Sequence, residues 1–261
     1  MVVFFDIDGT IVDEDTQQIP LSTIRAVERL GENGHVAVVN TGRPYSHIDP
    51  RVRAMAFGGW VCGCGMEIRL NGRWLVRSAP DLALCRYVRD SVRECGMQVL
   101  YETDDGAILT DGPLSVHPTA ELEVRRMREK GFAIREIDSL PQPCFMKLVT
   151  YDWPGCRREE FLRRMEPYFT CIDRGNTMLE LVLKGCSKAG GMERLLDHLG
   201  VGKADALAIG DSTNDLPMFL AAGHTACMGG GMAELKAHAE FITDTVLKDG
   251  IEKALAHFHL L

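Results

Sequence analysis

The sequence predicts an α/β fold, with a Rossmann-like, mostly parallel sheet core and an inserted α+β domain. Short apolar runs alternate with longer amphipathic stretches towards both ends of the 261-residue chain, which is the pattern of βαβ units. From about residue 80 this pattern gives way to helices mixed with strand-like pieces. We therefore expect the core to comprise residues 1–79 and 178–261, and the inserted domain to comprise residues 80–177.

The first half of the core predicts a strand, a helix, a second strand and a hairpin. Val2–Phe5 is an apolar run typical of a buried parallel strand. Pro20 opens a helix with its apolar residues on one face, and two glycines end it. Val36–Val39 is the second strand, and residues 66–77 form a hairpin around Asn71-Gly72.

The rest of the chain predicts a further set of helices and strands. In the inserted domain we expect helices at 81–94 and 119–130 and a strand at 145–151. The core then resumes with a strand at 178–182, a helix at 187–199, a strand at 206–209 and closing helices at 214–222, 232–238 and 249–257.

Composition and charge exclude several classes of protein. The 46% hydrophobic and 25% charged residues are ordinary for a soluble globular domain, and the net charge of −8 argues against a nucleic-acid partner. The first apolar run stops at Asp6, and no stretch reaches the roughly 18 apolar residues that a membrane span needs. The nine cysteines include no CxxC pair, so we expect reduced thiols and a cytoplasmic protein without a membrane partner.

Acidic side chains follow two of the predicted strands. Asp6 and Asp8 come directly after the first strand, and their i, i+2 spacing points both carboxylates the same way. Asp211 and Asp215 follow the strand at 206–209. The carboxyl ends of parallel strands are where such sheets bind ligands, and a divalent cation relieves the repulsion between grouped carboxylates. Because oxygen ligands suit magnesium, the sequence predicts a Mg²⁺ site there.

Cationic and hydroxyl groups are expected at the same edge of the sheet. Lys188 lies at the start of a helix, where backbone N–H groups also favour an anion. Thr41 follows the second strand and supplies a hydroxyl. A metal, an ammonium group, a hydroxyl group and backbone amides together form the kind of site that stabilises phosphoryl transfer.

Four segments in order resemble the motifs of the haloacid dehalogenase superfamily. They are Phe5–Thr10, Asn40–Pro44, Gly185–Lys188 and Ile209–Asp215. Their spacing resembles that of the Cof-type phosphatases, which carry a large inserted cap called C2. The resemblance covers nearly the whole chain and implies a magnesium-dependent phosphatase with an inserted substrate-specificity domain.

The resemblance also implies a role for each matching residue. Asp6 is expected to be the nucleophile that forms an aspartyl-phosphate, and Asp8 the general acid and base. The metal ligands are expected to be Asp6, the Asp8 carbonyl, Asp211 and, directly or through another ligand, Asp215. The phosphoryl group is expected to contact Thr41, Gly42, Arg43, Lys188 and Asn214. The resemblance also allows Arg43 to contact the cap. From their positions alone, Asn214 and Asp215 are also good helix caps, and Arg43 is also suited to a surface position.

Two segments depart from the family pattern. Cys64-Gly65-Met66 stands where the family often has Asn-Gly-Ala, and Met228-Gly229-Gly230-Gly231 stands where it often has Met-Gly-Asn-Ala. Neither segment contains an expected reacting group, so the departures concern local loop shape and the identity of the substrate.

The expected substrate is a small phosphorylated metabolite, by default a sugar phosphate, and the protein is expected to be a monomer or homodimer. A phosphomutase of similar architecture, which returns the phosphoryl group to a sugar, is the nearest alternative. A non-catalytic anion-binding regulatory protein is a second alternative, although it has no need of both Asp6 and Asp8. The first strand lacks the glycine fingerprint of a nucleotide-dependent dehydrogenase.

Overall fold

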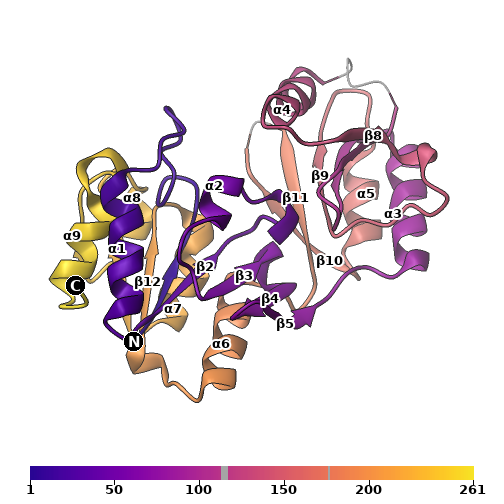
Figure 1. Ribbon diagram of the computed structural model, residues 1–261. Coiled ribbons are helices and arrows are strands. Elements are labelled where there is room, and N and C mark those ends of the chain that lie inside the picture. Colours follow the sequence, from indigo (N-terminus) through magenta and orange to yellow (C-terminus); the bar gives the residue numbers. More distant parts are fainter. Residues whose placement is uncertain (113–116, 176) are drawn as a thin grey trace. The chain divides into compact units, whose positions relative to one another are not determined.

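The chain forms two compact units in the computed structural model, which describes residues 1–112, 117–175 and 177–261 (Figure 1). The first unit comprises Met1–Arg43, Ile48–Arg77 and Ser187–Leu261, and the second comprises Pro44–His47 and Ser78–Cys186. The predicted α/β fold class is confirmed. No helix within the described residues has the length and apolarity that crossing a membrane requires.

The first unit is built on an eight-stranded sheet with the order β14-β13-β12-β1-β2-β3-β4-β5. Neighbours from β14 to β3 are parallel, and β4 and β5 add an antiparallel hairpin at one edge. The strands are β1 (Val2–Phe5), β2 (Val36–Asn40), β3 (Gly59–Cys62), β4 (Glu67–Leu70), β5 (Arg73–Arg77), β12 (Ala206–Gly210), β13 (His224–Cys227) and β14 (Phe241–Ile242).

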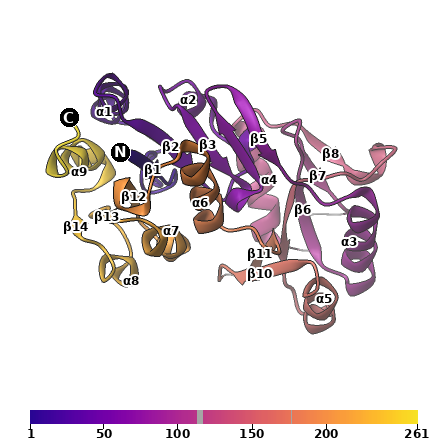
Figure 2. The same ribbon diagram turned by 90° about the horizontal axis from the view of Figure 1, so that it is seen from below.

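Helices cover both faces of this sheet. They are α1 (Leu21–Glu32), α2 (Pro50–Arg53), α6 (Lys188–Leu199), α7 (Leu216–Ala221), α8 (Ala233–Lys236) and α9 (Gly250–His257). Helices α6 and α7 contact each other and pack onto one face through a shared apolar cluster, and α1 and α9 lie side by side on the other (Figure 2). Residues in β1 are buried on both faces, which explains why this strand reads as a continuous apolar run.

The second unit contains a six-stranded sheet with the order β10-β11-β9-β6-β7-β8. Its strands are β6 (Gln98–Glu102), β7 (Ile108–Thr110), β8 (Ile134–Glu136), β9 (Lys147–Tyr151), β10 (Phe169–Asp173) and β11 (Met178–Leu183). Its helices are α3 (Leu82–Cys95), α4 (Pro118–Glu129) and α5 (Arg158–Met165).

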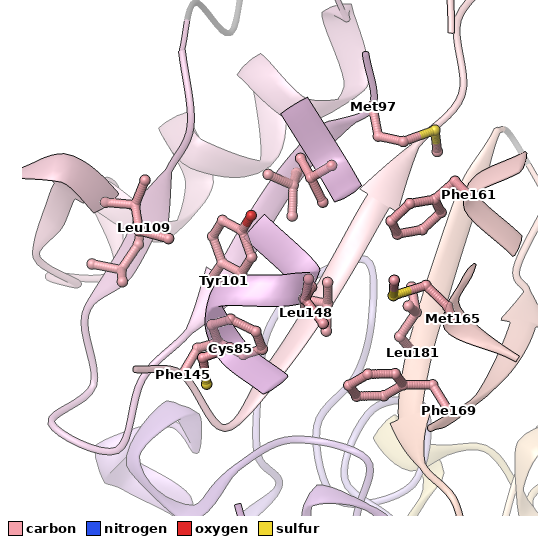
Figure 3. Packing of buried hydrophobic residues seen from close by; sticks show 14 of the residues in the cluster. Cys85, Met97, Tyr101, Leu109, Phe145, Leu148, Phe161, Met165, Phe169 and Leu181 are labelled. Carbon is pink, nitrogen blue, oxygen red and sulfur yellow. The ribbon is translucent and has the colours of Figure 1, made fainter. Parts of the chain in front are cut away.

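The two faces of the second sheet carry different helices. Helices α3 and α5 pack on one face around a large apolar cluster that includes Tyr101, Leu148 and Phe161 (Figure 3). Helix α4 packs on the other face, where Ala120 and Val124 belong to a smaller cluster. This unit therefore has an apolar core of its own.

The prediction that residues 178–182 return to the core sheet is wrong. Strand β11 pairs antiparallel with β9 and β10 in the second sheet, and the second unit extends to Cys186. The segment alternates in a way that a half-buried antiparallel strand requires, because Leu179 and Leu181 join the α3–α5 core while Glu180 points to the other face.

Glu180 lies in a buried ion cluster on that other face. Its carboxylate pairs with Lys147 of β9 and accepts a hydrogen bond from Nε of Arg174 over 2.6 Å. Burial alone would raise the pKa of Glu180, but the two cations lower it to about 2. Lys147 is thus buried and ion-paired within the second unit.

Candidate active site

The nucleophile predicted from the sequence lies at the carboxyl end of the central strand. Asp6 follows β1, its side chain is buried, and its backbone N–H donates to the carbonyl of Ile209 over 3.0 Å. Gly9 follows in a left-handed conformation with a φ of +76°. A Cβ atom at Gly9 would lie 2.5 Å from Oδ2 of Asp211, so only glycine allows this turn to approach the second acidic loop.

The loop after β12 brings Asp211 and Asp215 beside Asp6. Asp215 folds back over the strand end, where its Oδ2 accepts hydrogen bonds from the N–H groups of Asp211 (3.0 Å) and Ser212 (3.2 Å). Gly210 makes room for it, because a Cβ atom there would lie 2.5 Å from the same oxygen. One carboxylate oxygen from each of Asp6, Asp211 and Asp215 lies within 4.8 Å of the others.

Lys188 joins this group from the first turn of α6. Its Nζ donates to Oδ1 of Asp6 over 2.6 Å and to Oδ1 of Asp215 over 2.5 Å, and its side chain is only 3% exposed. Ser187 caps the helix, because its Oγ accepts a hydrogen bond from the N–H of Gly190 over 2.9 Å. This cap fixes Lys188 as the first residue of the helix. A single ammonium group thus bridges two carboxylates that come from different loops.

Crowding shifts the proton affinities of these groups. Burial and the charge of Asp215 raise the pKa of Asp6 to about 7 against the opposing effect of Lys188. Burial and the charge of Asp6 raise the pKa of Asp211 to about 8. Burial would lower the pKa of Lys188, but Asp215 and Asp6 outweigh it and raise that pKa. The site therefore contains more carboxyl groups than one lysine can neutralise in their ionised form.

The acidic residues fit a divalent cation. Oδ1 of Asp211 is buried and has no hydrogen-bond partner among the described residues, as expected of an oxygen that serves as a metal ligand. Asp6 and Asp211 offer oxygens to the same small volume. Both oxygens of Asp215 already accept hydrogen bonds, which suits a residue that orients its neighbours better than one that ligates directly.

Asp8 is held by Arg43 rather than by the acidic group. Nε of Arg43 donates to Oδ2 of Asp8 over 2.8 Å, and Nη2 donates to Oδ1 over 3.1 Å. Both side chains are about one-third exposed, at 32% for Arg43 and 37% for Asp8. In this structure Arg43 thus forms a bidentate ion pair with the predicted acid–base residue.

The other predicted phosphate-binding residues occupy loops at this edge of the sheet. Thr41 is buried directly after β2, and its Oγ1 accepts from the N–H of Arg43 over 3.2 Å, with Gly42 between them. Asn214 lies in the turn before α7, where its Oδ1 accepts from Oγ of Ser212 over 2.6 Å. The side chain of each residue thus makes a hydrogen bond within its own loop.

The sequence reasoning missed Asn40, which supports Lys188. Asn40 is fully buried at the end of β2, and its Nδ2 donates to the backbone carbonyl of Lys188 over 3.1 Å. In the sequence, this role is indicated by a polar residue at the end of an apolar strand. The segment Cys64-Gly65-Met66 also reaches α6, because a Cβ atom at Gly65 would lie 2.7 Å from the carbonyl of Ser187.

Residues 3–255 match the family described as haloacid dehalogenase-like hydrolases. The chain is 26% identical over 246 residues to an HMP-PP phosphatase of Yersinia enterocolitica, with 89% of this chain and 85% of that protein covered. It is 22% identical to the 5-amino-6-(5-phospho-D-ribitylamino)uracil phosphatase YitU of Bacillus subtilis, with 100% and 98% covered.

The fold resembles that of a solved phosphatase as well. A phosphatase of the haloalkanoate enzyme superfamily from Bacteroides thetaiotaomicron superposes with a TM-score of 0.83 and 25% identity, covering 100% of this chain and 95% of that one. These similarities extend across both units of the chain.

Proposed function

The chain belongs to the haloacid dehalogenase-like hydrolases, as its four motifs predict, and we propose that it is a magnesium-dependent phosphatase acting through an aspartyl-phosphate. The observation that carries the proposal is the meeting of Asp6, Lys188 and Asp211 at one sheet edge, where carboxylates outnumber the neutralising cation. Such a site suits a bound metal and a phosphoryl group better than it suits a purely structural role.

In the first step an oxygen of Asp6 attacks phosphorus, and the bond from phosphorus to the leaving oxygen breaks. Asp8 donates a proton to that oxygen, so that an alcohol departs. In the second step Asp8 takes a proton from water, the water oxygen attacks phosphorus, and inorganic phosphate leaves Asp6 as a free carboxylate. The chemistry thus consumes one water for each phosphate released.

Lys188 places positive charge beside the carboxylate of Asp6, which lowers the repulsion between this carboxylate and an incoming phosphate. Thr41, Gly42 and Asn214 are proposed to hold the phosphoryl oxygens, and Arg43 is proposed to hold Asp8 through their ion pair. Asp6, Asp211 and the Asp8 carbonyl would hold Mg²⁺, with Asp215 as a supporting carboxylate. Bound there, the ion would supply charge neutralisation for the transferring group.

The second unit is proposed to serve as the substrate-specificity cap and to exclude water during the first step. The substrate is proposed to be a small phosphorylated metabolite, by default a sugar phosphate. The relatives support a range of such substrates, since their names specify phosphatases of unlike compounds. The protein is proposed to act in the cytoplasm as a monomer or homodimer.

The test is phosphate release from a panel of phosphorylated metabolites, with and without Mg²⁺. The wild-type protein should release phosphate only when the ion is present, and Asp6→Asn should lower turnover by more than about 10³-fold while substrate binding persists. Conversion of a sugar phosphate to an isomer without phosphate release would instead identify a phosphomutase. Normal turnover by Asp6→Asn would show that the aspartyl-phosphate mechanism is wrong.

A further inference from the structure

The four residues that follow the Thr41–Arg43 loop belong to the second unit. The segment Pro44–His47 groups with residues 78–186, whereas the chain on either side of it groups with the core. Oγ of Ser46 donates to the carbonyl of Thr103 over 2.8 Å. The segment is therefore held by side chains as well as by chain continuity.

His47 provides the second anchor of this segment. Its ring is only 2% exposed and stacks on Phe132, with ring centroids 5.4 Å apart and an interplanar angle of 9°. Its Nε2 lies 3.3 Å from the carbonyl of Ala107. A buried, stacked imidazole ring fixes the orientation of the segment more firmly than one hydrogen bond does.

Arg43 is joined to the anchored segment by a single peptide bond. The next residue is Pro44, whose ring fixes its own φ and also restricts the backbone of Arg43 to extended conformations. On the core side, the carbonyl of Arg43 accepts from the N–H of Gly63 over 2.8 Å. Any change in how Pro44–His47 is seated thus reaches the arginine through a stiff connection.

We propose that Arg43 is a positioning residue for Asp8, and that the seating of Pro44–His47 in the second unit sets the position of Arg43. The inference rests on the proposed function, in which Asp8 is the general acid and base. Two parallel N–H donors on both oxygens of a carboxylate fix its rotation as well as its place. The second unit thereby acts on the reacting groups of the core through the chain itself.

The test measures leaving-group release in a single turnover with enzyme in excess, which reports the first chemical step alone. An alkyl phosphate needs a proton from Asp8 to leave, whereas p-nitrophenyl phosphate leaves without one. Asp8→Asn is therefore expected to lower the rate of leaving-group release from the alkyl phosphate about 100-fold or more, and the rate from the aryl phosphate much less.

Arg43→Gln should also lower the rate of release from the alkyl phosphate more than that from the aryl phosphate, with a loss of about 10-fold for the alkyl phosphate. Arg43→Lys should not restore the rate, because an ammonium group keeps the charge but cannot make the bidentate contact. Restoration of the alkyl rate by Arg43→Lys would show that charge alone matters and would overturn the positioning role.

The anchor is tested with His47→Ala and the milder Ser46→Ala, each expected to slow the alkyl phosphate several-fold more than the aryl phosphate. Ser139→Ala is the matched control, since that exposed serine also donates to a carbonyl of the second unit, over 2.6 Å, and should leave both rates unchanged. Combined with Arg43→Gln, neither anchor variant should add a further loss, because both act through the arginine.

Thermal unfolding of each variant separates positioning from loss of fold, and Ser46→Ala decides if His47→Ala unfolds. Three results would each overturn the inference. The anchor variants could release both leaving groups at the wild-type rates, they could lower both rates equally, or they could lower the rate of the Arg43→Gln protein further when combined with it. A wild-type protein that releases no phosphate would instead overturn the proposed function.

Discussion

Nζ of Lys188 lies 2.6 Å from Oδ1 of Asp6, although the two residues are 182 positions apart in the chain. The contact joins the first strand of the core to the first helix that follows the second unit. This edge of the core sheet therefore forms only when segments before and after the second unit have folded together. It also places a positive charge directly beside the carboxylate of Asp6.

Lys188→Met should destabilise the metal-free protein by about 3–5 kcal/mol, because it leaves Asp6 and Asp215 buried without their cation. Urea denaturation measures the loss, and a divalent cation should restore part of it by neutralising the same carboxylates. Lys253→Met is the control, since its partner Asp244 is exposed and the pair should contribute nothing measurable. Equal stability of the Lys188 variant and wild type would contradict the bridging role.

Divalent-cation binding should tighten as pH rises from about 6 to about 9, because Asp6 (pKa about 7) and Asp211 (pKa about 8) must lose protons to ligate the ion. Calorimetry in buffers of different ionisation enthalpy should show protons released on binding, more at pH 6 than at pH 9. Binding that does not change with pH would contradict the crowding of these two carboxylates.

The same shifts predict how stability depends on pH without metal. Asp6 and Asp211 hold protons in the folded protein at pH values where the unfolded chain, with carboxyl pKa near 3.8, has lost them. The free energy of unfolding should therefore fall as pH rises from about 4 to about 8. Saturating divalent cation should stabilise the protein more at pH 8 than at pH 6, a difference that urea denaturation at both pH values measures.

Gly210→Ala should lower both stability and phosphate release, because its Cβ would lie 2.5 Å from Oδ2 of Asp215 and force that carboxylate to move. The expected destabilisation is about 1–3 kcal/mol. Gly230→Ala is the matched control in a neighbouring loop, where a Cβ atom would meet nothing within 4 Å. A Gly210 variant with wild-type activity would show that the folded-back position of Asp215 is dispensable.

Glu180→Gln should destabilise the protein by about 3–5 kcal/mol, since it leaves Lys147 and Arg174 without their shared buried carboxylate. Glu166→Gln is the control, because its partner Lys184 and Glu166 itself are solvent-exposed. The difference in free energy of unfolding between wild type and Glu180→Gln should persist above pH 4.5. It should shrink as pH falls towards about 2, the lowered pKa of Glu180. An advantage that does not change over this range would contradict the ion cluster.

The core and its acidic edge could be predicted because they follow from simple rules. Apolar runs such as Val2–Phe5 read as buried parallel strands, and parallel strands present their carboxyl ends at one edge. Asp6 and Asp211 therefore had to be neighbours once β1 and β12 paired. Local spacing predicts the strand ends at which the two carboxylates lie, and the shared edge of a parallel sheet brings those ends together.

Other features depend on pairing between distant segments, which no local pattern encodes. Strand β11 has an apolar alternation that fits either sheet, and only its register with β9 and β10 assigns it to the second. The ion pair of Arg43 with Asp8 requires two loops to meet in a particular orientation. Local periodicity carries no information about such an orientation.

The chain passes between the two units at four places, after Arg43, His47, Arg77 and Cys186. Transplanting the second unit onto another core by cutting only after Arg77 and after Cys186 would leave Pro44–His47 behind in its original core, without the residues it contacts. A chimera should be active only when Pro44–His47 is transplanted together with residues 78–186. In evolutionary terms, the inserted domain and a loop of the ancestral core are expected to diversify as one inherited piece.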